Sequence, residues 1–598
     1  MNRWLRSSML SLAILLVLTV SAIWTAPVLA DDGTPPPPPD AASEPASPPD
    51  EAVPAVDEPA AQDSSIVETA PVEAPAVDES AAASDSAAQD ATVADVIAAI
   101  PDGTALVVLD ADGEALPLST QEAADAILSG DPWWCPNTSA PGSAGCTLIG
   151  GTVTTGSASQ LTFNGALLAF LTANNTRPLS VLGGTIWIES IYTGASEGGP
   201  VVIDGPTIGG NMATGFLNIK GGWNGLTNGL GTTSSGSPST FSGISLSITN
   251  WQADVTLSNI FITGVSGAGS TALTVTTTKN ITTTNVNVLT NAGAGASLDN
   301  TSGTGNVVVT SSHFESNAGT TAGTGGLVVH SKGAITLNSV TAILNEGAGA
   351  YLDNTFYVGL TPLNVTLTGS SNFSSNGDDG LNVKTKGMIT LNSVTASLNG
   401  QNGNPLLGWG ATLDNTPATT AKSVTLTGTN TFWGNSGSGL GVLSDGIITL
   451  GNVTANDNSY DGTFLDNTSA TLAMAVTITN SSFNNNAQAS SVTTDEQSWQ
   501  MGLQVYSKGA ITISDLTATD NGNLDADSDD GGAVLNNTAG TAGITLTGTS
   551  IVSGNEWGLG IWTKGSVAIS NLIANANTDG SGAYIDACIE TFTGSGIC

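Results

Sequence analysis

The sequence predicts an all-β protein whose main domain is a parallel β-solenoid with two rungs in each repeat. Three observations support this: a recurring phrase, short alternating strands, and apolar columns of complementary size. The phrase Leu-Asp-Asn-Thr and its decayed copies occupy residues 298–301, 352–355, 413–416, 465–468, 535–538 and 585–586. Its acidic position recurs every 50 to 70 residues, and a fixed internal period of this length is typical of a solenoid.

Each repeat contains two strand-rich rungs. Runs such as Ile335-Thr336-Leu337 alternate apolar and polar residues and are bounded by Gly, Asn and Ser, as expected of strands joined by tight turns. One inward column is predicted at Leu327, Ala350, Leu381, Ala411, Leu440, Thr463, Leu503, Ala533, Leu559 and Ala583. A second column, opposite in phase, is predicted at Ala342, Phe373, Ala396, Phe432, Ala455, Phe483, Ala518, Ile551 and Ala574. Close packing favours such complementary volumes, which explains the two-rung period.

One turn of every rung carries an asparagine. A ladder of side-chain amides that hydrogen-bond from rung to rung is therefore predicted. Its members are Asn345, Asn376, Asn399, Asn435, Asn458, Asn486, Asn521 and Asn555.

The N-terminal region predicts export. Residues 1–30 combine Arg3 and Arg6 with an apolar stretch and a small-residue cleavage site, as in a secretory signal peptide. No membrane span is expected after its cleavage. Residues 31–91 are rich in Pro, Ala and acid and are expected to form a disordered linker. We therefore expect a secreted or cell-surface protein.

A small α+β module is predicted at 92–147, followed by the solenoid at 148–598, with a capping helix at 161–171 and regular repeats from about 272. The module includes a hairpin formed by 105–110 and 114–118. The four cysteines fall into two local pairs, which predicts the disulfides Cys135–Cys146 and Cys588–Cys598 in an oxidising compartment.

Composition limits the partners. The net charge is −39, and residues 31–131 carry 23 acids and no Lys or Arg. A polyanion of this kind is not expected to bind nucleic acid or anionic lipid. Calcium, cationic surfaces and neutral glycans remain as partners.

The pattern Lys-Gly-x-Ile-Thr-Leu-x-x-Val-Thr-Ala at 332–342 and 386–396, with a shorter copy at 508–513, resembles a known family. It is similar to the right-handed parallel β-helix repeat family, the pectate-lyase-like superfamily in the broad sense, and to large uncharacterised exported bacterial repeat proteins. The resemblance covers about residues 180–598 and implies a right-handed parallel β-helix. This scaffold hosts lyases, hydrolases, adhesins and ice-binding proteins, so it does not define an activity.

Polysaccharide cleavage is the best-known activity of the family that the sequence resembles. The run Gly-Asp-Asp-Gly at 377–380 looks like the paired aspartates of polygalacturonase-like hydrolases, so an enzyme would use Asp378 and Asp379, with Lys384 nearby. The same turn in the next repeat unit reads Ser-Gly-Ser-Gly at 436–439, and the Gly-His-Gly and Arg-x-Lys segments of these hydrolases are absent. The sequence favours an acidic turn and assigns no catalytic residue.

An outward column joins the repeated aspartates. It is predicted at His330, Asp353, Lys384, Asp414, Leu443, Asp466, Tyr506, Asn536, Trp562 and Asp586. Lys384 would form cross-strand ion pairs with its two aspartate neighbours, and Lys332, Lys386, Lys508 and Lys564 would do so diagonally. Tyr506 and Trp562 occupy the variable slot, where exposed aromatic rings can stack on sugars, so they are the candidate glycan contacts.

Two further features have two interpretations each. Asp525, Asp527 and Asp529 alternate before Gly531, as in a calcium loop, but residue 536 is Asn where such a loop has a bidentate Glu; an ordinary acidic loop is the alternative. Thr-x-Thr strands such as 366–368 and 425–427 resemble those of ice-binding β-solenoids, although Thr is also favoured on any solvent-facing strand.

The sequence thus predicts an exported, adhesin-like β-helix protein without enzymatic activity, which presents a polar face to a polysaccharide or cell surface. It requires no cofactor, with calcium as the open case. The alternative is a polysaccharide lyase or hydrolase on the same scaffold. No C-terminal cap is evident before Cys598, which suggests end-to-end self-association through an open strand edge.

Overall fold

The computed structural model describes a parallel β-helix within the compact unit that spans Ala88–Cys598. The described residues are 108–109, 115–116, 132–148, 167, 171, 183–194, 197–208, 212–225, 233–319, 325–356, 363–400, 408–418, 420–487, 500–522, 531–578 and 587–591. The predicted signal peptide (1–30), the predicted linker (31–91), the acidic run at Asp525–Asp529 and Cys598 lie outside them. Among the described residues, no helix is long and apolar enough to cross a membrane.

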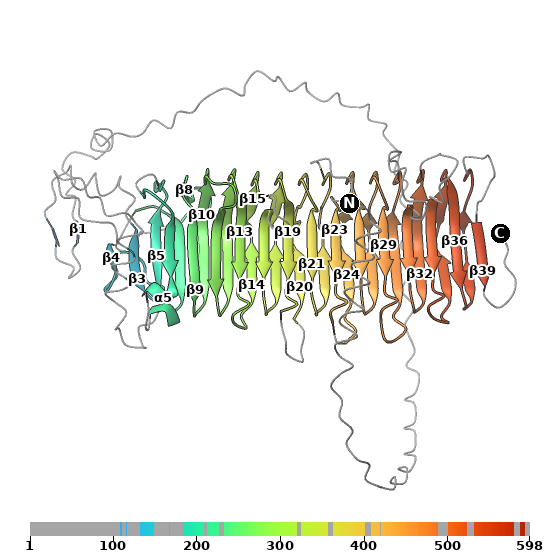
Figure 1. Ribbon diagram of the computed structural model, residues 1–598, viewed down its shortest axis with the longest axis horizontal. Helices are drawn as coiled ribbons and strands as arrows, with labels where there is room; N and C mark the ends of the chain where they lie inside the picture. The colour runs from blue at the N-terminus through green and yellow to red at the C-terminus, as the bar shows by residue number, and fades with distance from the viewer. Residues whose placement is uncertain are drawn as a thin grey trace, which may run out of the picture. The chain divides into compact units, whose positions relative to one another are not determined.

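One wall of the β-helix is a parallel sheet, here called the long sheet, which receives one strand from each rung (Figure 1). In spatial order its strands are β6 (Val201–Asp204), β9 (Leu246–Trp251), β11 (Thr271–Thr277), β13 (Ala294–Asp299), β16 (Gly325–His330), β19 (Ala348–Asp353), β21 (Leu381–Lys384), β23 (Ala411–Asp414), β26 (Leu440–Leu443), β29 (Thr463–Asp466), β31 (Met501–Tyr506), β33 (Gly531–Asn536), β36 (Trp557–Thr563) and β39 (Ala587–Thr591). Chain order equals spatial order, as expected of a solenoid.

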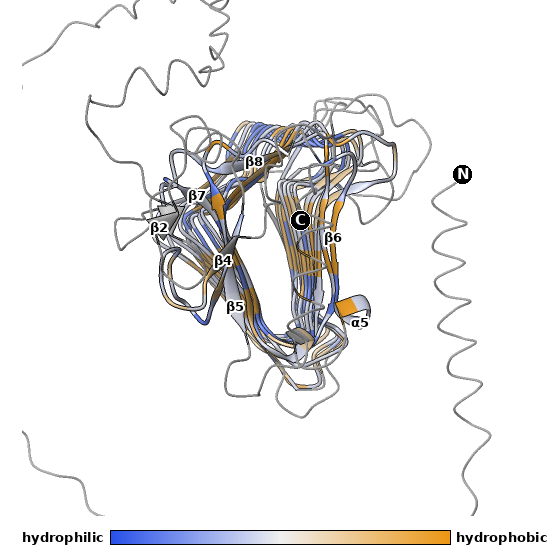
Figure 2. Ribbon diagram, turned by 90° about the vertical axis from the view of Figure 1, so that its left-hand side faces the viewer, coloured by the Kyte–Doolittle hydropathy of each residue, from blue (hydrophilic) through white to orange (hydrophobic). Residues whose placement is uncertain are grey.

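The other walls belong to a second sheet, here called the bent sheet, which turns a corner between β7 and β8 (Figure 2). Its strands are β3 (Trp133–Pro136), β4 (Thr147–Leu148), β5 (Gly184–Glu189), β7 (Leu217–Trp223), β8 (Ser239–Ser242), β10 (Val255–Thr263), β12 (Ile281–Leu289), β14 (Val307–Thr310), β15 (His313–Glu315), β17 (Ile335–Asn338), β18 (Thr341–Ile343), β20 (Val365–Thr368), β22 (Ile389–Asn392), β24 (Val424–Thr427), β25 (Asn430–Thr431), β27 (Ile448–Gly451), β28 (Val453–Thr454), β30 (Val476–Ser482), β32 (Ile511–Thr519), β34 (Ile544–Thr547), β35 (Ser550–Ser553), β37 (Val567–Ile569) and β38 (Leu572–Ile573). Left-handed residues form the corner, for example Asn259 and Asn285 at φ 54° and 52°. Asparagine tolerates this region better than most side chains.

The predicted inward columns are confirmed over most of their length. Leu327 pairs with Ala350 and then Leu381, and all three side chains are buried in one continuous core. Consecutive Leu-Asp-Asn-Thr phrases lie two rungs apart, because His330 stands between Asp299 and Asp353. The two-rung repeat is therefore a property of the fold.

The register prediction was wrong near the C-terminal end. Leu559 pairs with Ala587, not Ala583, and Trp562 pairs with Glu590, not Asp586. The cause is a degenerate pattern, since 583–586 and 587–590 both read Ala-x-Ile-acid. The second column also shifts by one residue there, because Ala518 pairs with the buried Val552 and not with Ile551.

The predicted asparagine ladder is present and longer than expected. Each amide Nδ2 donates to the Oδ1 of the next asparagine at 2.8 to 3.1 Å. The buried members are Asn291, Asn317, Asn345, Asn376, Asn399, Asn435, Asn458, Asn486, Asn521, Asn555 and Asn577. A glycine of the neighbouring rung leaves room for each amide from Asn317 to Asn555; a Cβ on Gly410 would lie 2.8 Å from the Nδ2 of Asn435. The ladder thus satisfies buried polar groups that would otherwise be costly.

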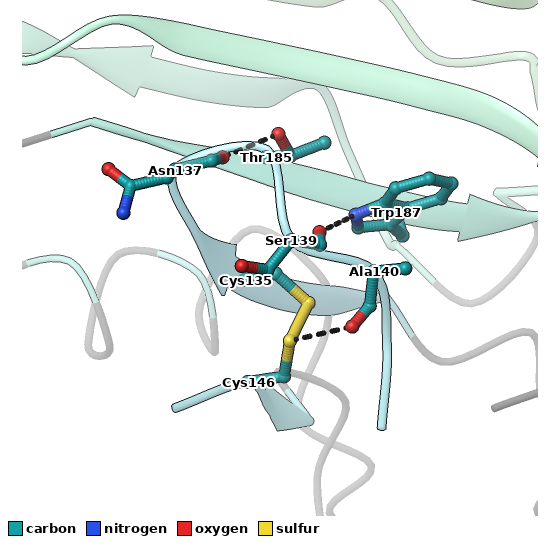
Figure 3. Close-up of a disulfide and its surroundings, with 7 residues drawn as sticks. All are labelled: Cys135, Asn137, Ser139, Ala140, Cys146, Thr185 and Trp187. Atoms are coloured by element: carbon teal, nitrogen blue, oxygen red, sulfur yellow. Dashed lines mark hydrogen bonds between the residues drawn. A yellow bond between two sulfur atoms is a disulfide. The ribbon is translucent and has the colours of Figure 1, made fainter. Parts of the chain in front are cut away.

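A disulfide-closed hairpin covers the N-terminal edge of the bent sheet (Figure 3). Cys135 and Cys146 form the predicted disulfide, with a Cα–Cα distance of 4.1 Å, and β3 pairs antiparallel with both β4 and β5. The Trp187 Nε1 donates to the carbonyl of Ser139 at 2.9 Å, which ties the hairpin loop to β5. An edge strand paired in this way is protected from association with other chains.

Among the residues that the structure describes, the helical ones lie in the N-terminal part of the β-helix. They include α5 (Gly205–Ile208), η2 (Met212–Thr214), and two residues of the predicted capping helix, Leu167 and Leu171, which are both buried in the core. The remainder of 161–171 lies outside the described residues. The predicted hairpin of the N-terminal module is present as β1 (Val108–Leu109) paired antiparallel with β2 (Ala115–Leu116).

Candidate functional site

The candidate site is the outer face of the long sheet, where the outward residues form two columns. The end column, at the last outward position of each strand, contains His330, Asp353, Lys384, Asp414, Leu443, Asp466, Tyr506, Asn536, Trp562 and Glu590. The middle column, two residues earlier, contains Val328, Tyr351, Asn382, Thr412, Gly441, Phe464, Gln504, Val534 and Gly560. The two columns differ from rung to rung, unlike the core beneath them.

The aspartates of the recurring phrase close turns along their own chain. In each phrase the Asp Oδ1 accepts hydrogen bonds from the backbone N and Oγ1 of the Thr two residues later, at 2.7 to 2.9 Å. Asn536 does the same for Thr538 at 3.0 and 2.8 Å. The following asparagine is buried and donates to backbone carbonyls, as Asn354 does to Leu363 at 2.8 Å. The turn therefore needs an acceptor oxygen and not a negative charge.

The predicted ion pairs of Lys384 were wrong. Its side chain is exposed and makes no ion pair with Asp353 or Asp414, whose carboxylates turn toward Thr355 and Thr416. Two of the diagonal lysines also bind elsewhere: the Nζ of Lys508 donates to the carbonyl of Ala470, and that of Lys564 to the carbonyl of Thr538 at 2.6 Å. These lysines stabilise turns. On the bent sheet, the His313 Nε2 lies 3.0 Å from the Glu315 carboxylate, within the distance of an ion pair.

Aromatic side chains recur along the outer face. Toward the N-terminal end, the His330 ring meets Tyr351 edge-on at 5.8 Å and Phe356 at 5.6 Å. The Tyr351 hydroxyl lies 3.4 Å from the Oδ2 of Asp353, and burial, followed by the charge of Asp353, raises the pKa of Tyr351 to about 12. A tyrosine, a histidine and a carboxylate thus share two neighbouring rungs.

A second aromatic group lies four to five rungs further along. Phe464 and Tyr506 have ring centroids 5.8 Å apart at a tilt of 44°. The Asp461 Oδ1 accepts from the Gln504 Nε2 at 2.8 Å and from the backbone N of Met501 at 2.9 Å. Burial raises the pKa of Tyr506, and the charges of Asp461 and then Asp466 raise it further. The phenol therefore lies in the negative field of two carboxylates.

Tryptophans complete the series. Trp557 and Trp562 stack at 5.7 Å with an interplanar angle of 18°. Both rings converge over Gly560, where a Cβ would meet Trp557 at 1.9 Å and Trp562 at 2.8 Å. Trp409 likewise lies over Gly441, at 2.5 Å from the position of a Cβ. Glycine in the middle column lets these indoles lie against the sheet.

Of the predicted glycan contacts, Tyr506 and Trp562 are each partly buried and each beside a second ring, Phe464 and Trp557. The sequence prediction missed these two rings, as well as Tyr351 and Trp409. Tyr351 and Phe464 could have been found from the sequence, because each lies two residues before a member of the end column. The register of the end column therefore also pairs Tyr351 with Asn382 and Phe464 with Gln504.

The paired aspartates are separated from Lys384. Asp379 lies in the corner before β21 and Lys384 ends the strand, and at roughly 3.3 Å per residue the strand alone separates them by about 10 Å. The Asp379 Oδ1 accepts from the backbone N of Gly408 and Trp409 at 3.2 and 2.9 Å. Burial raises the pKa of Asp379. Asp379 and Asp461 have the same role, because each carboxylate accepts a hydrogen bond from the backbone at the start of the next rung: Asp379 from Gly408 and Trp409, and Asp461 from Met501.

The described residues contain no group of three or more His, Cys, Asp or Glu side chains that could hold a metal ion. Asp525, Asp527 and Asp529 lie outside those residues, and so does the partner in the predicted Cys588–Cys598 disulfide. The calcium prediction and the second disulfide therefore stay predictions.

The chain matches no protein-family model and no curated protein. Two solved structures are similar to it. One is the A-module of the mannuronan C-5 epimerase AlgE4 of Azotobacter vinelandii, at 12% identity, over 63% of this chain and 91% of that chain, with a TM-score of 0.27. The other is the pectate lyase Pel9A, at 13% identity, over 62% of this chain and 72% of that chain, with a TM-score of 0.18. The strand registers show that the chain has a parallel β-helix fold.

Proposed function

We propose that this protein is an exported surface or matrix rod that binds a linear polysaccharide along the outer face of the long sheet, and that it is not an enzyme. The observation that carries the proposal is the series of aromatic side chains on that face: His330, Tyr351, Phe356, Trp409, Phe464, Tyr506, Trp557 and Trp562. From His330 to Trp562 there are eight strand-to-strand steps, or about 38 Å at roughly 4.8 Å per step.

Aromatic faces are suited to sugar rings, because the apolar C–H faces of a sugar can stack on them while its hydroxyls bond to polar neighbours. The polar neighbours here include Gln504, Asp466 and Asn536, which lie beside Phe464 and Tyr506. Rings repeated along one axis favour a polymer that contacts several of them together, so that weak single contacts add up.

The geometry of the acidic residues supports binding over cleavage. Asp379 and Asp461 accept backbone hydrogen bonds from the next rung, and Asp353, Asp414 and Asp466 close turns. These contacts give each carboxylate a structural role that requires no substrate.

A glycan-array screen of the full-length protein, with calcium and with chelator, tests the proposal when soluble products from the same polysaccharides are measured in parallel. Retention without products is the expected result. Unsaturated or reducing-end products would contradict it and direct attention to Asp378, Asp379 and Lys384. Loss of retention on chelation would assign a calcium site to Asp525, Asp527 and Asp529.

A further inference from the structure

We infer that the polysaccharide bound at the Phe464–Tyr506 group is cationic, a polymer of amino sugars with free ammonium groups. This inference rests on the proposed function and specifies its ligand. It follows from how rings and charges are combined on four successive rungs of the long sheet, β26, β29, β31 and β33.

The charges on this part of the face are of one sign. In the end column, Leu443 precedes Asp466 and Asn536 follows Tyr506, so no lysine lies next to Asp466 along the column. Lys508 follows β31, but its Nζ donates to the Ala470 carbonyl in the turn. Asp461 adds a second negative charge on the opposite side of Phe464. The first aromatic group differs, because Lys384 is the register neighbour of Asp353 there.

The Asp466 carboxylate has capacity for a ligand. Its Oδ1 accepts both hydrogen bonds from Thr468, at 2.7 Å each, whereas its Oδ2 has no hydrogen-bond partner within the described residues. An ammonium group there would meet a carboxylate oxygen on the rung next to Tyr506, the register neighbour of Asp466. Carboxylates and aromatic rings both attract ammonium ions, and their combination selects them over neutral amides.

The chain supplies a matched variant. Asp466→Asn removes the charge but keeps the Oδ1 acceptor, and Asn536 already performs that role toward Thr538 in the same turn of another repeat. The variant is therefore expected to fold and melt as the wild type does. Asp414→Asn is the control, because Asp414 closes the same turn toward Thr416, next to Lys384 and Leu443 and not next to an aromatic ring in its column.

Titration calorimetry with glucosamine and N-acetylglucosamine hexamers tests the inference. We expect the wild type to bind the glucosamine hexamer at least about fivefold more tightly, Asp466→Asn to lose most of that preference, and Asp414→Asn to keep it. Because both variants remove one charge, general attraction between a polyanion and a polycation would affect them equally and would overturn the inference.

The result also separates the two proposals. Equal binding of both hexamers, or a neutral polysaccharide retained with an Asp466→Asn affinity equal to that of the wild type, would overturn the cationic ligand and leave the polysaccharide rod. Binding of neither hexamer and of no polysaccharide on the array would contradict both.

Discussion

The outer faces of the two sheets are built on the same core but have different chemistry. On the bent sheet, one outward column is almost entirely threonine: Thr256, Thr282, Val308, Thr336, Thr366, Thr390, Thr425, Thr449, Thr477, Thr512 and Thr545. Within the described residues, none of these threonine hydroxyls has a hydrogen-bond partner. The corresponding columns of the long sheet change residue type at nearly every rung.

The comparison teaches where recognition resides in a repeat protein. Threonine is favoured in strands and is polar enough for a solvent-facing position. A column of threonines therefore needs no explanation beyond the repetition of the same strand in every rung. Variable aromatic and charged residues on an equally regular strand are not needed by the repeat. We therefore assign recognition to the long sheet and a structural role to the threonine column.

The largest expected effect comes from the ladder that supports both faces. Asn458→Ala would remove the acceptor of the Asn435 backbone N and Nδ2 and the donor to the Phe432 carbonyl, and it would remove one of the two hydrogen bonds that residue 458 donates to the Asn486 Oδ1. It should lower the free energy of unfolding by about 4 kcal/mol. Thr449→Ala, on the threonine column, should change it by less than about 0.5 kcal/mol. Urea unfolding measures both variants. Equal losses would contradict the distinction between the ladder and the face.

A smaller effect separates two glycines. A Cβ on Gly410 would lie 2.4 Å from the Gly439 carbonyl oxygen, whereas a Cβ on Gly451 of the bent sheet meets nothing closer than 3.6 Å. Gly410→Ala should therefore cost about 2 kcal/mol, because backbone must move. Gly451→Ala should be neutral or slightly stabilising. Thermal melting compares the two, and a stable Gly410→Ala variant would show that the corner beside the ladder is loosely packed.

The smallest effect depends on pH. Since burial raises the pKa of Asp379 in the folded state, its ionisation disfavours folding. This cost is absent below the unfolded pKa, grows as pH rises from the unfolded to the folded value, and is constant above the folded value. Asp379→Asn keeps the acceptor for Gly408 and Trp409. It should be more stable than the wild type at pH 7, and the difference should vanish near pH 3. A variant less stable at pH 7 would show that the charge itself is required there.

Much of the fold could be predicted from the sequence, because period and volume repeat. The ladder from Asn345 to Asn555 required only that each asparagine occupy the same turn. The register failed at Ala583, where the pattern recurs four residues later and the apolar alternation cannot distinguish the two alignments. The predicted ion pairs failed for a different reason. The position of Lys384 beside Asp353 was correct, but a threonine two residues after the aspartate provides a nearer donor.

The site was predicted only in part, because a site depends on which residues meet across rungs. Tyr506 and Trp562 were selected as single exposed aromatics, whereas the neighbouring rings, Phe464 and Trp557, follow from register and from the space above Gly560. Such pairs require neighbouring rungs to be aligned before side chains are compared.

The most direct test compares polysaccharide binding by two double variants, one with substitutions on the outer face of the long sheet and one with substitutions on the threonine column of the bent sheet. A polysaccharide retained by the wild type on the array is used in affinity electrophoresis with two double variants of the full-length protein. Tyr506→Ala/Trp562→Ala should weaken its binding at least about fivefold, because each ring contributes roughly 0.5–1.5 kcal/mol. Thr449→Ala/Thr477→Ala should bind as the wild type does. Equal binding by both variants, or a loss confined to the threonine variant, would contradict the assignment of recognition to the long sheet.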